Sequence, residues 1–198
     1  VAFPAFDEGA LPRFLAKDSL FRAPVLGYIM RKLAHIPVVR GSVDARKSLI
    51  TARKIVEAGG AVVIFPEGTT THDPQLWPMQ ARTVATGAPV YPVVHWGDEQ
   101  ILGYVDEAGE DGRIKEKRKI SLFPRKTVRV RVGKALDIAS LVEDASPEAK
   151  HTRTELGVVT DAMLDAITAE LEKIRGEKAP EGRWNPRTKR REAPGTPS

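Results

Sequence analysis

The sequence predicts an α/β fold built on a mixed, mostly parallel central sheet flanked by helices. Two apolar runs, residues 61–66 and 88–94, show no alternation, which is typical of strands buried on both faces of a parallel sheet. Residues 127–132 alternate valine with other residues, which is typical of a strand with one wet face at a sheet edge. We expect its valines to point inward and its arginines outward. Helical patterns lie between and after these strands, and this interleaving is typical of α/β proteins.

Short strands and helices alternate through the first third of the chain. Residues 11–17 predict a strand, and residues 23–33 predict a helix with one apolar face. Residues 36–40 form a short extended run. Ser42 predicts the start of a second helix, because its hydroxyl can accept a hydrogen bond from a free backbone N–H group. Gly59 predicts where that helix ends, because glycine readily adopts the left-handed conformation that terminates helices.

The rest of the chain predicts a loop, a long helix and a tail. Residues 98–119 are rich in glycine and charge without a period, so we expect a long surface loop. Residues 152–175 predict a helix ended by Gly176. Its apolar positions share one stripe that we expect in the core: Leu156, Val159, Met163, Leu164, Ile167, Leu171 and Ile174. We expect one domain over residues 1–176. Residues 177–198 carry four prolines and six basic against three acidic residues, which predicts a basic, Pro-rich flexible tail.

Composition narrows the possible functions. The chain contains no cysteine, which excludes a disulfide framework, a cysteine-ligated zinc site and a thiolate nucleophile. Its net charge of +5 favours a polyanionic partner, and charge alone leaves nucleic acid, anionic lipid and phosphorylated substrates open. No stretch approaches the ~18 apolar residues of a membrane span. The start at Val1 shows no export signal. We therefore expect a cytoplasmic protein whose membrane contact is peripheral.

The most informative segment follows the first apolar run and reads Phe65-Pro66-Glu67-Gly68-Thr69. Ligands of α/β folds bind where strands leave the sheet. Gly68 lets the backbone approach a ligand closely, and Thr69 offers a hydroxyl and an N–H group to anionic oxygens. Glu67 would repel a phosphate, so we expect a hydroxyl group or a cationic side chain as its partner. We predict that Glu67 is catalytic and that its four neighbours bind substrate.

Several blocks, in order along the chain, resemble the glycerolipid acyltransferase family, and in particular its lysophosphatidic acid acyltransferases. The sequence Phe-Pro-Glu-Gly-Thr of residues 65–69 is similar to the motif that follows an apolar strand in that family. Residues 14–17 resemble its strand ending in a basic residue. Residues 36–40 resemble its Ile-Pro-Val-x-Arg block, and residues 88–93 its proline-bearing strand. Two later segments are similar to an actinobacterial branch of the family: residues 123–128 and 175–180.

The resemblance implies an enzyme of phospholipid biosynthesis with the glycerol-3-phosphate acyltransferase type of fold. It would move a fatty acyl group from acyl-CoA or acyl-carrier protein to the free hydroxyl of lysophosphatidic acid, giving phosphatidic acid. No metal or redox cofactor is implied. The implied partners are the acyl thioester donor, the lysophospholipid acceptor and an anionic membrane surface. We therefore expect peripheral association with the inner face of the cell membrane.

The base in that family is a His followed, after four residues, by an Asp that orients it. None of the four histidines of this chain has that Asp, because the fifth positions after them are Arg40, Trp77, Gln100 and Leu156. In relatives the pair lies just upstream of a segment like the one that begins at Val1, so we expect it to precede Val1 in the complete protein. His72 and His95 lack a carboxylate at suitable spacing, and we predict no catalytic role for them.

Lys17 and Arg40 are the predicted phosphate-binding residues. A glycerol phosphate headgroup carries about two negative charges near neutral pH, and it favours charge-assisted hydrogen bonds. The family often has Arg directly after Glu-Gly-Thr, where this chain has Thr70. The first alternative is therefore an acyltransferase for another lipid alcohol, and the second is a catalytically inactive lipid-binding protein. Nucleic acid binding by the tail is disfavoured, because no recognised motif or interleaved aromatic residues accompany its charge.

Overall fold

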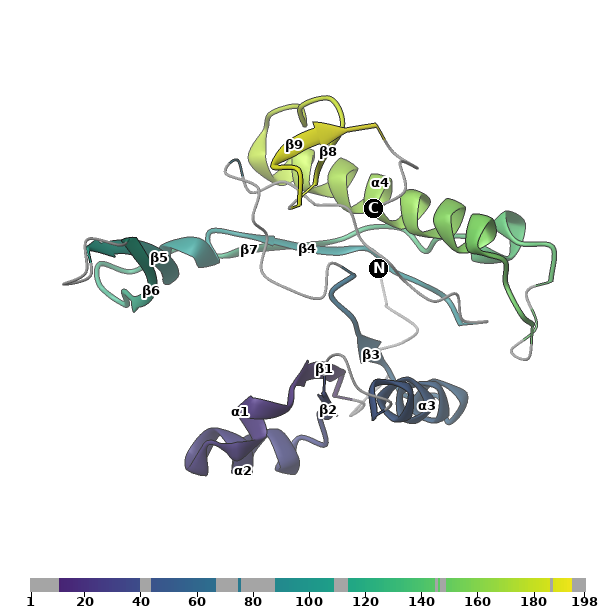
Figure 1. The fold of residues 1–198 in the computed structure, drawn as a ribbon, viewed down its shortest axis with the longest axis horizontal. Helices are drawn as coiled ribbons and strands as arrows, with labels where there is room; N and C mark the ends of the chain where they lie inside the picture. The colour runs from purple at the N-terminus through teal and green to yellow at the C-terminus, as the bar shows by residue number, and fades with distance from the viewer. Residues whose placement is uncertain are drawn as a thin grey trace. The chain divides into compact units, whose positions relative to one another are not determined.

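The computed structural model describes residues 11–39, 44–66, 75, 88–108, 114–144, 146, 149–185 and 187–193. The chain divides into two compact units. The N-terminal unit comprises Val1–Thr70 and Thr86–Ala88, and the C-terminal unit comprises Thr71–Ala85 and Pro89–Ser198. Figure 1 labels the helices and strands of both units. The described strands form one parallel sheet and three antiparallel pairs, which confirms the mixed α/β class.

Three short parallel strands form the sheet of the N-terminal unit. β1 (Arg13–Lys17) lies between β2 (Ile36–Val38) and β3 (Val62–Val63). Parallel neighbours require the chain to cross back between them. The predicted strand at residues 11–17 is confirmed, and so is the extended run that starts at residue 36.

Helices supply both crossovers of this sheet. α1 (Asp18–Arg22) and α2 (Pro24–Lys32) connect β1 to β2, and α3 (Asp44–Glu57) connects β2 to β3. The predicted helix at residues 23–33 is α2, which starts at a proline because the first helical position needs no N–H donor. α3 ends before Gly59, whose φ of 81° is the predicted left-handed conformation. Ser42, the predicted cap of this helix, lies outside the described residues.

The apolar run at residues 61–66 is less buried than predicted. Only Val62 and Val63 form a strand, Ile64 is exposed and Phe65 is 52% exposed. α3 packs against β3, and no second described helix makes a comparable contact with it. One face of this segment therefore stays open, and the prediction of burial on both faces is wrong for the described part of the chain.

A long helix on a two-stranded sheet forms the core of the C-terminal unit. β4 (Val93–Trp96) pairs with β7 (Arg129–Val132), and α4 (Arg153–Arg175) packs along both strands (Figure 1). The run at residues 88–94 was expected in a parallel sheet. That expectation is wrong, because the strand starts at Val93 and its described partner is antiparallel.

α4 confirms the predicted helix at residues 152–175 and both of its ends. The hydroxyl of Thr152 accepts a hydrogen bond from the N–H of Glu155 at 3.2 Å, and the carboxylate of Glu155 accepts the Thr152 N–H at 2.8 Å. This reciprocal capping box satisfies two N–H groups that a helix start otherwise leaves free. Gly176 ends the helix with a φ of 72°. The apolar stripe is core as predicted, and Leu164 is only 1% exposed. Within the described ranges, no helix combines the length and apolar character that crossing a bilayer requires.

In the strand at residues 129–132, the face that carries Arg131 lies toward α4, and not the valine face as predicted. The Nε of Arg131 donates to Glu170 of α4 at 3.0 Å, and Val130 is 62% exposed. Arg131 is paired with buried Val94, so both lie on the face that α4 covers. The pKa of Glu170 is lowered by hydrogen bonds from Lys173 and then from Arg131. The buried carboxylate of Glu170 on α4 thus pairs with an arginine of this strand. The expectation that the valines point inward is therefore wrong.

A hairpin occupies much of the predicted loop at residues 98–119. β5 (Leu102–Ala108) pairs antiparallel with β6 (Ile114–Ile120). One pair of facing residues carries opposite charges, Glu107 and Lys115, and another carries like charges, Asp106 and Glu116. The many charged residues of both strands leave no apolar alternation in the sequence that could predict them. The prediction of a long loop without strands is therefore wrong.

A second hairpin lies inside the predicted flexible tail. β8 (Arg183–Asn185) pairs antiparallel with β9 (Arg190–Glu192). The Arg183 guanidinium, whose side chain is 8% exposed, binds the carboxylates of Asp161 and Asp165 on α4. Prolines exclude a long helix here but not a hairpin. The expectation that residues 177–198 bury little is therefore wrong at Arg183, while the domain boundary at residue 176 stays a prediction.

Candidate functional site

The candidate site is the carboxyl edge of the N-terminal sheet. Parallel strands end at a common edge, and ligands of open α/β sheets bind outside it. β1 ends at Lys17, which is paired with Val38 at the end of β2. Phe14 is paired with Val63, where β3 ends and the chain continues into Phe65 and Pro66. The three N-terminal blocks that resemble the acyltransferase family therefore converge on one edge.

An aromatic contact joins two of these blocks. The rings of Phe14 and Phe65 are stacked with centroids 6.5 Å apart and planes 24° apart. His35 lies edge-on to Phe14 with the ring centroids 5.3 Å apart. Its Nδ1 accepts the backbone N–H of Phe14 at 3.2 Å, so a neutral His35 carries its proton on Nε2. His35 thus helps to hold β1 at this edge. No sequence pattern predicts this role, because the contact depends on β1 and β2 being neighbours.

Lys17 places a cation at the same edge. It is exposed at the end of β1 and directly precedes α1. The nearest acid in sequence, Asp18, accepts hydrogen bonds from Nε and Nη2 of Arg22 at 2.9 and 2.6 Å. Among the described residues, Lys17 has no ion-pair partner. Its ammonium group is therefore free to bind an anionic ligand.

The other predicted site residues are only partly described. Phe65 is exposed and Pro66 is half-buried at the end of the third block. Four predicted residues lie outside the described part of the chain, and their roles stay predictions: Arg40, Glu67, Gly68 and Thr69. Among the residues that are described, no three His, Cys, Asp or Glu side chains come together in a way that could hold a metal ion.

A histidine–carboxylate pair occurs in the C-terminal unit. Nδ1 of His95 lies 2.7 Å from Oδ1 of Asp98, and both side chains are about half exposed. Gly97, with a φ of 103°, turns the chain between them. The prediction that His95 lacks a carboxylate partner is therefore wrong, and the Gly97 turn was the signal for it. Exposed pairs of this kind contribute little to stability. His72 lies outside the described residues.

The matching family model covers about the first half of the chain. Residues 2–96 match the acyltransferase family model. That segment contains all three strands of the parallel sheet and the Phe-Pro-Glu-Gly-Thr block.

Curated relatives support the acyltransferase segment at moderate identity. One is the chloroplastic 1-acyl-sn-glycerol-3-phosphate acyltransferase BAT2 of Brassica napus, 33% identical over 97 residues that cover 46% of this chain and 28% of the relative. The N-acylphosphatidylethanolamine synthase of Arabidopsis thaliana is 28% identical over 159 residues, which cover 75% of this chain and 53% of the relative. Lysophosphatidylcholine acyltransferase 2 of Mus musculus is 31% identical over 88 residues, which cover 42% of this chain and 16% of the relative. The chain thus spans about half or less of these relatives.

A solved structure is also similar. The crystal structure of the 1-acyl-sn-glycerophosphate acyltransferase PlsC from Thermotoga maritima matches 85% of this chain and 59% of its own length, with a TM-score of 0.49 and 17% sequence identity.

Proposed function

We propose that this protein is a glycerolipid acyltransferase that converts lysophosphatidic acid to phosphatidic acid. The observation that carries the proposal is the convergence of three family blocks on the carboxyl edge of the parallel sheet, inside the segment that matches the acyltransferase family. The donor is an acyl-CoA or acyl-carrier-protein thioester, and no metal or redox cofactor takes part. The protein works in the cytoplasm on the inner face of the membrane, and residues 1–176 form its acyltransferase domain.

The reaction is a direct acyl transfer. The acceptor hydroxyl oxygen attacks the thioester carbonyl carbon, the ester C–O bond forms and the C–S bond breaks. A base removes the hydroxyl proton, which then leaves on the thiol. By resemblance that base is an imidazole from a His-x4-Asp pair. No histidine among the 198 residues has that spacing, so the proposal requires the pair elsewhere in the complete protein, and the sequence of the gene tests this.

Residues at the sheet edge would hold the acceptor. Lys17 is exposed and has no ion-pair partner in the described ranges, which suits it to a phosphate with about two negative charges. Arg40 would follow the end of β2 and add a second cation. Gly68 and Thr69 would line the cleft, and Phe65 and Pro66 would form its apolar wall. Glu67 would position the attacking hydroxyl or a cationic side chain.

Substitution of Glu67 tests the proposal. In the complete protein, Glu67→Gln should lower kcat for acyl transfer to lysophosphatidic acid by roughly 100-fold, because a small misplacement of the reacting groups has that effect. Glu57→Gln is the matched control: Glu57 lies in the same unit, on α3, in an exposed pair with Arg53 at 2.6 Å. It should leave kcat unchanged. Wild-type turnover by Glu67→Gln would contradict the role of Glu67. No turnover by the wild-type protein, with the gene encoding no His-x4-Asp pair, would favour the catalytically inactive lipid-binding protein.

A second acceptor is favoured by two observations. Thr70 replaces the Arg that often follows Glu-Gly-Thr in the family. The relative matched over 75% of this chain is an N-acylphosphatidylethanolamine synthase. Acyl transfer should therefore be compared on lysophosphatidic acid, lysophosphatidylcholine and phosphatidylethanolamine. A higher kcat/KM for either of the last two would replace lysophosphatidic acid as the acceptor and keep the acyltransferase assignment.

A further inference from the structure

The helix α2 turns an apolar face to the surface. Its inner side is fixed by Gly27, which is buried so closely against α1 that an added Cβ would lie 2.1 Å from the carbonyl oxygen of Phe21. The opposite side carries exposed apolar residues, and we name it the α2 outer face: Val25, Leu26, Tyr28, Ile29 and Leu33. Val25 is 74% exposed and Tyr28 is 59% exposed. A helix on the surface of a water-soluble protein normally places polar residues there.

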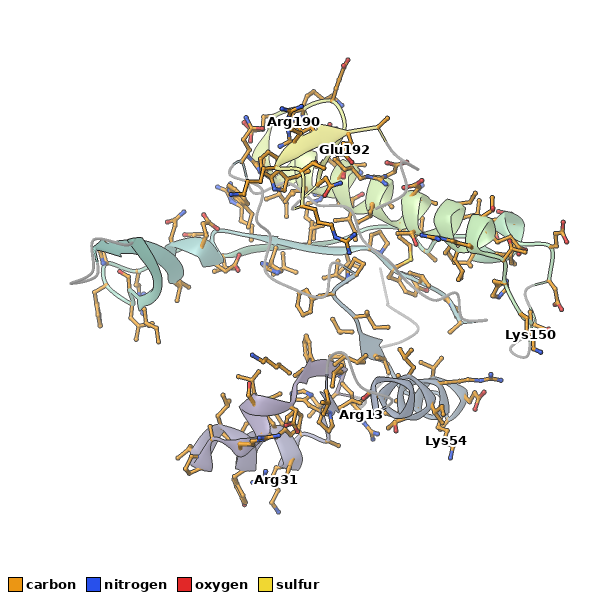
Figure 2. The ribbon with its side chains drawn as sticks, in the orientation of Figure 1. Arg13, Arg31, Lys54, Lys150, Arg190 and Glu192 are labelled. Carbon is orange, nitrogen blue, oxygen red and sulfur yellow. The ribbon has the colours of Figure 1, made fainter. Side chains whose placement is uncertain are left out.

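The last turn of α2 is basic. Arg31 and Lys32 lie in the last turn of α2, and both are exposed. Arg31, labelled in Figure 2, donates to the carbonyl of Phe21 at 2.6 Å, so its guanidinium group lies on the Gly27 side of the helix. The Nζ of Lys32 lies 5.7 Å from the centroid of the Tyr28 ring. Residues 24–33 contain no Asp or Glu, so this segment has an uncompensated positive charge.

We propose that the α2 outer face docks on an anionic lipid bilayer. Helices that lie in the membrane interface combine an apolar face with Lys, Arg and aromatic residues at its border. The long Lys and Arg side chains can keep their charges among the lipid phosphates while the apolar residues enter the acyl boundary. A protein partner fits less well, because lysine is depleted in protein interfaces. The nine residues of α2 lie along the membrane surface.

The docked face is joined to the candidate site by a very short connection. α1 and α2 follow directly from Lys17 at the carboxyl edge of β1. A lipid whose phosphate binds Lys17 would then come from the same bilayer that α2 contacts. The physiological meaning of this contact rests on the proposed function, but vesicle binding is measured without an acyl donor and does not depend on turnover.

Vesicle sedimentation tests the contact. The chain should bind vesicles of equal parts phosphatidylglycerol and phosphatidylcholine more tightly than vesicles of phosphatidylcholine alone. Val25→Asp should weaken binding to the anionic vesicles by at least about tenfold, because one buried valine is lost from the contact. Val158→Asp is the matched control, since Val158 is a 46% exposed valine on α4, and it should bind as wild type. Val25→Leu should retain full binding.

Two variants that each remove one positive charge test the contribution of the basic residues. Lys32→Gln should weaken binding to the anionic vesicles by about fivefold and leave phosphatidylcholine binding unchanged, because one Lys near the surface contributes that much. Lys54→Gln removes the same charge from α3 instead of α2, and it should have no effect on vesicle binding; Lys54 is labelled in Figure 2.

The outcomes separate this proposal from its competitors. Equal binding of Val25→Asp and wild type would overturn it, and so would equal weakening by Val25→Asp and Val158→Asp. Loss of a wild-type dimer in Val25→Asp, with vesicle binding unchanged, would assign the face to a second copy of the chain. Glu67→Gln should bind vesicles as wild type does, so a failure of the proposed catalysis would leave the membrane contact standing.

Discussion

The helices α2 and α4 both carry an apolar stripe, but they use it in opposite ways. α4 buries its stripe against β4, and Leu164 there is 1% exposed. α2 turns its stripe outward, and Val25 there is 74% exposed. Apolar periodicity predicts both helices equally well. Apolar periodicity therefore identifies a helix but does not identify what covers its apolar face.

The two helices also end differently. α4 has a reciprocal capping box at Thr152 and a left-handed glycine at Gly176. α2 begins without a side-chain cap, and its contacts at Gly27 and Arg31 hold it to α1. α4 is therefore stabilised by its own ends and by the core, whereas α2 depends on α1 and, under our proposal, on a lipid surface.

The largest stability difference between the two helices should appear on truncating a leucine in each. Leu164→Ala should lower the free energy of unfolding by about 2–5 kcal/mol, because it leaves a cavity in the core. Leu26→Ala should change it by less than about 0.5 kcal/mol, because that side chain is already exposed. Urea denaturation measures both values. Similar losses would mean that α2 is covered within the protein itself.

A glycine in each helix gives the next contrast. Gly27→Ala should destabilise the protein by about 1–3 kcal/mol, because the new methyl group overlaps the backbone of Phe21. Gly157→Ala on α4 should stabilise it by about 0.5–1 kcal/mol, since nothing lies within 4 Å of the new Cβ and alanine favours a helix. Thermal unfolding reports the two shifts. Shifts of the same sign would contradict the close packing of α1 on α2.

The smallest effect concerns the cap of α4 and its dependence on pH. Hydrogen bonds from Thr152, backbone then hydroxyl, and from the Glu143 N–H lower the pKa of Glu155 to about 2. A carboxylate with a lowered pKa stabilises the fold above its ordinary value of 4.5 and loses that effect as the pH falls through about 2. The Tm of wild type should exceed that of Glu155→Gln at pH 7, and the difference should shrink as the pH falls from 4.5 toward 2. A constant difference would show that Glu155 acts through packing.

The elements whose structure depends on their own local sequence were predicted correctly. The capping residues, stripe and terminal glycine of α4 are all readable in sequence, and so are β1 and α2. Tertiary context decided the rest. The buried carboxylate of Glu170 places Arg131 on the face of β7 that α4 covers. Arg183 binds acidic partners on α4, about 20 residues away in sequence. The local sequence around Arg131 or Arg183 does not indicate which acidic residues of α4 bind it.

The sequence predicted which segments form the candidate site, but not the contacts between their side chains. Lys17 ends β1, and Phe65 and Pro66 follow the end of β3, on the side where the parallel strands end. The contacts of Phe14 with Phe65 and His35 could not be predicted, because they depend on strand order. Arg40, Glu67, Gly68 and Thr69 stay predictions. The His95–Asp98 pair was missed because a glycine turn, rather than a helical or strand period, brings the two residues together.

The most direct test of the central claim is the KM of Lys17→Gln for lysophosphatidic acid. The assay uses the complete protein in detergent mixed micelles, so that docking on a bilayer does not enter the measurement. The KM should rise roughly ten- to hundredfold with kcat and the KM for the acyl donor unchanged, because a charge-assisted hydrogen bond to the phosphate is lost. Lys54→Gln should match wild type. An unchanged KM in Lys17→Gln would contradict the claim that the carboxyl edge of β1 binds the lipid headgroup.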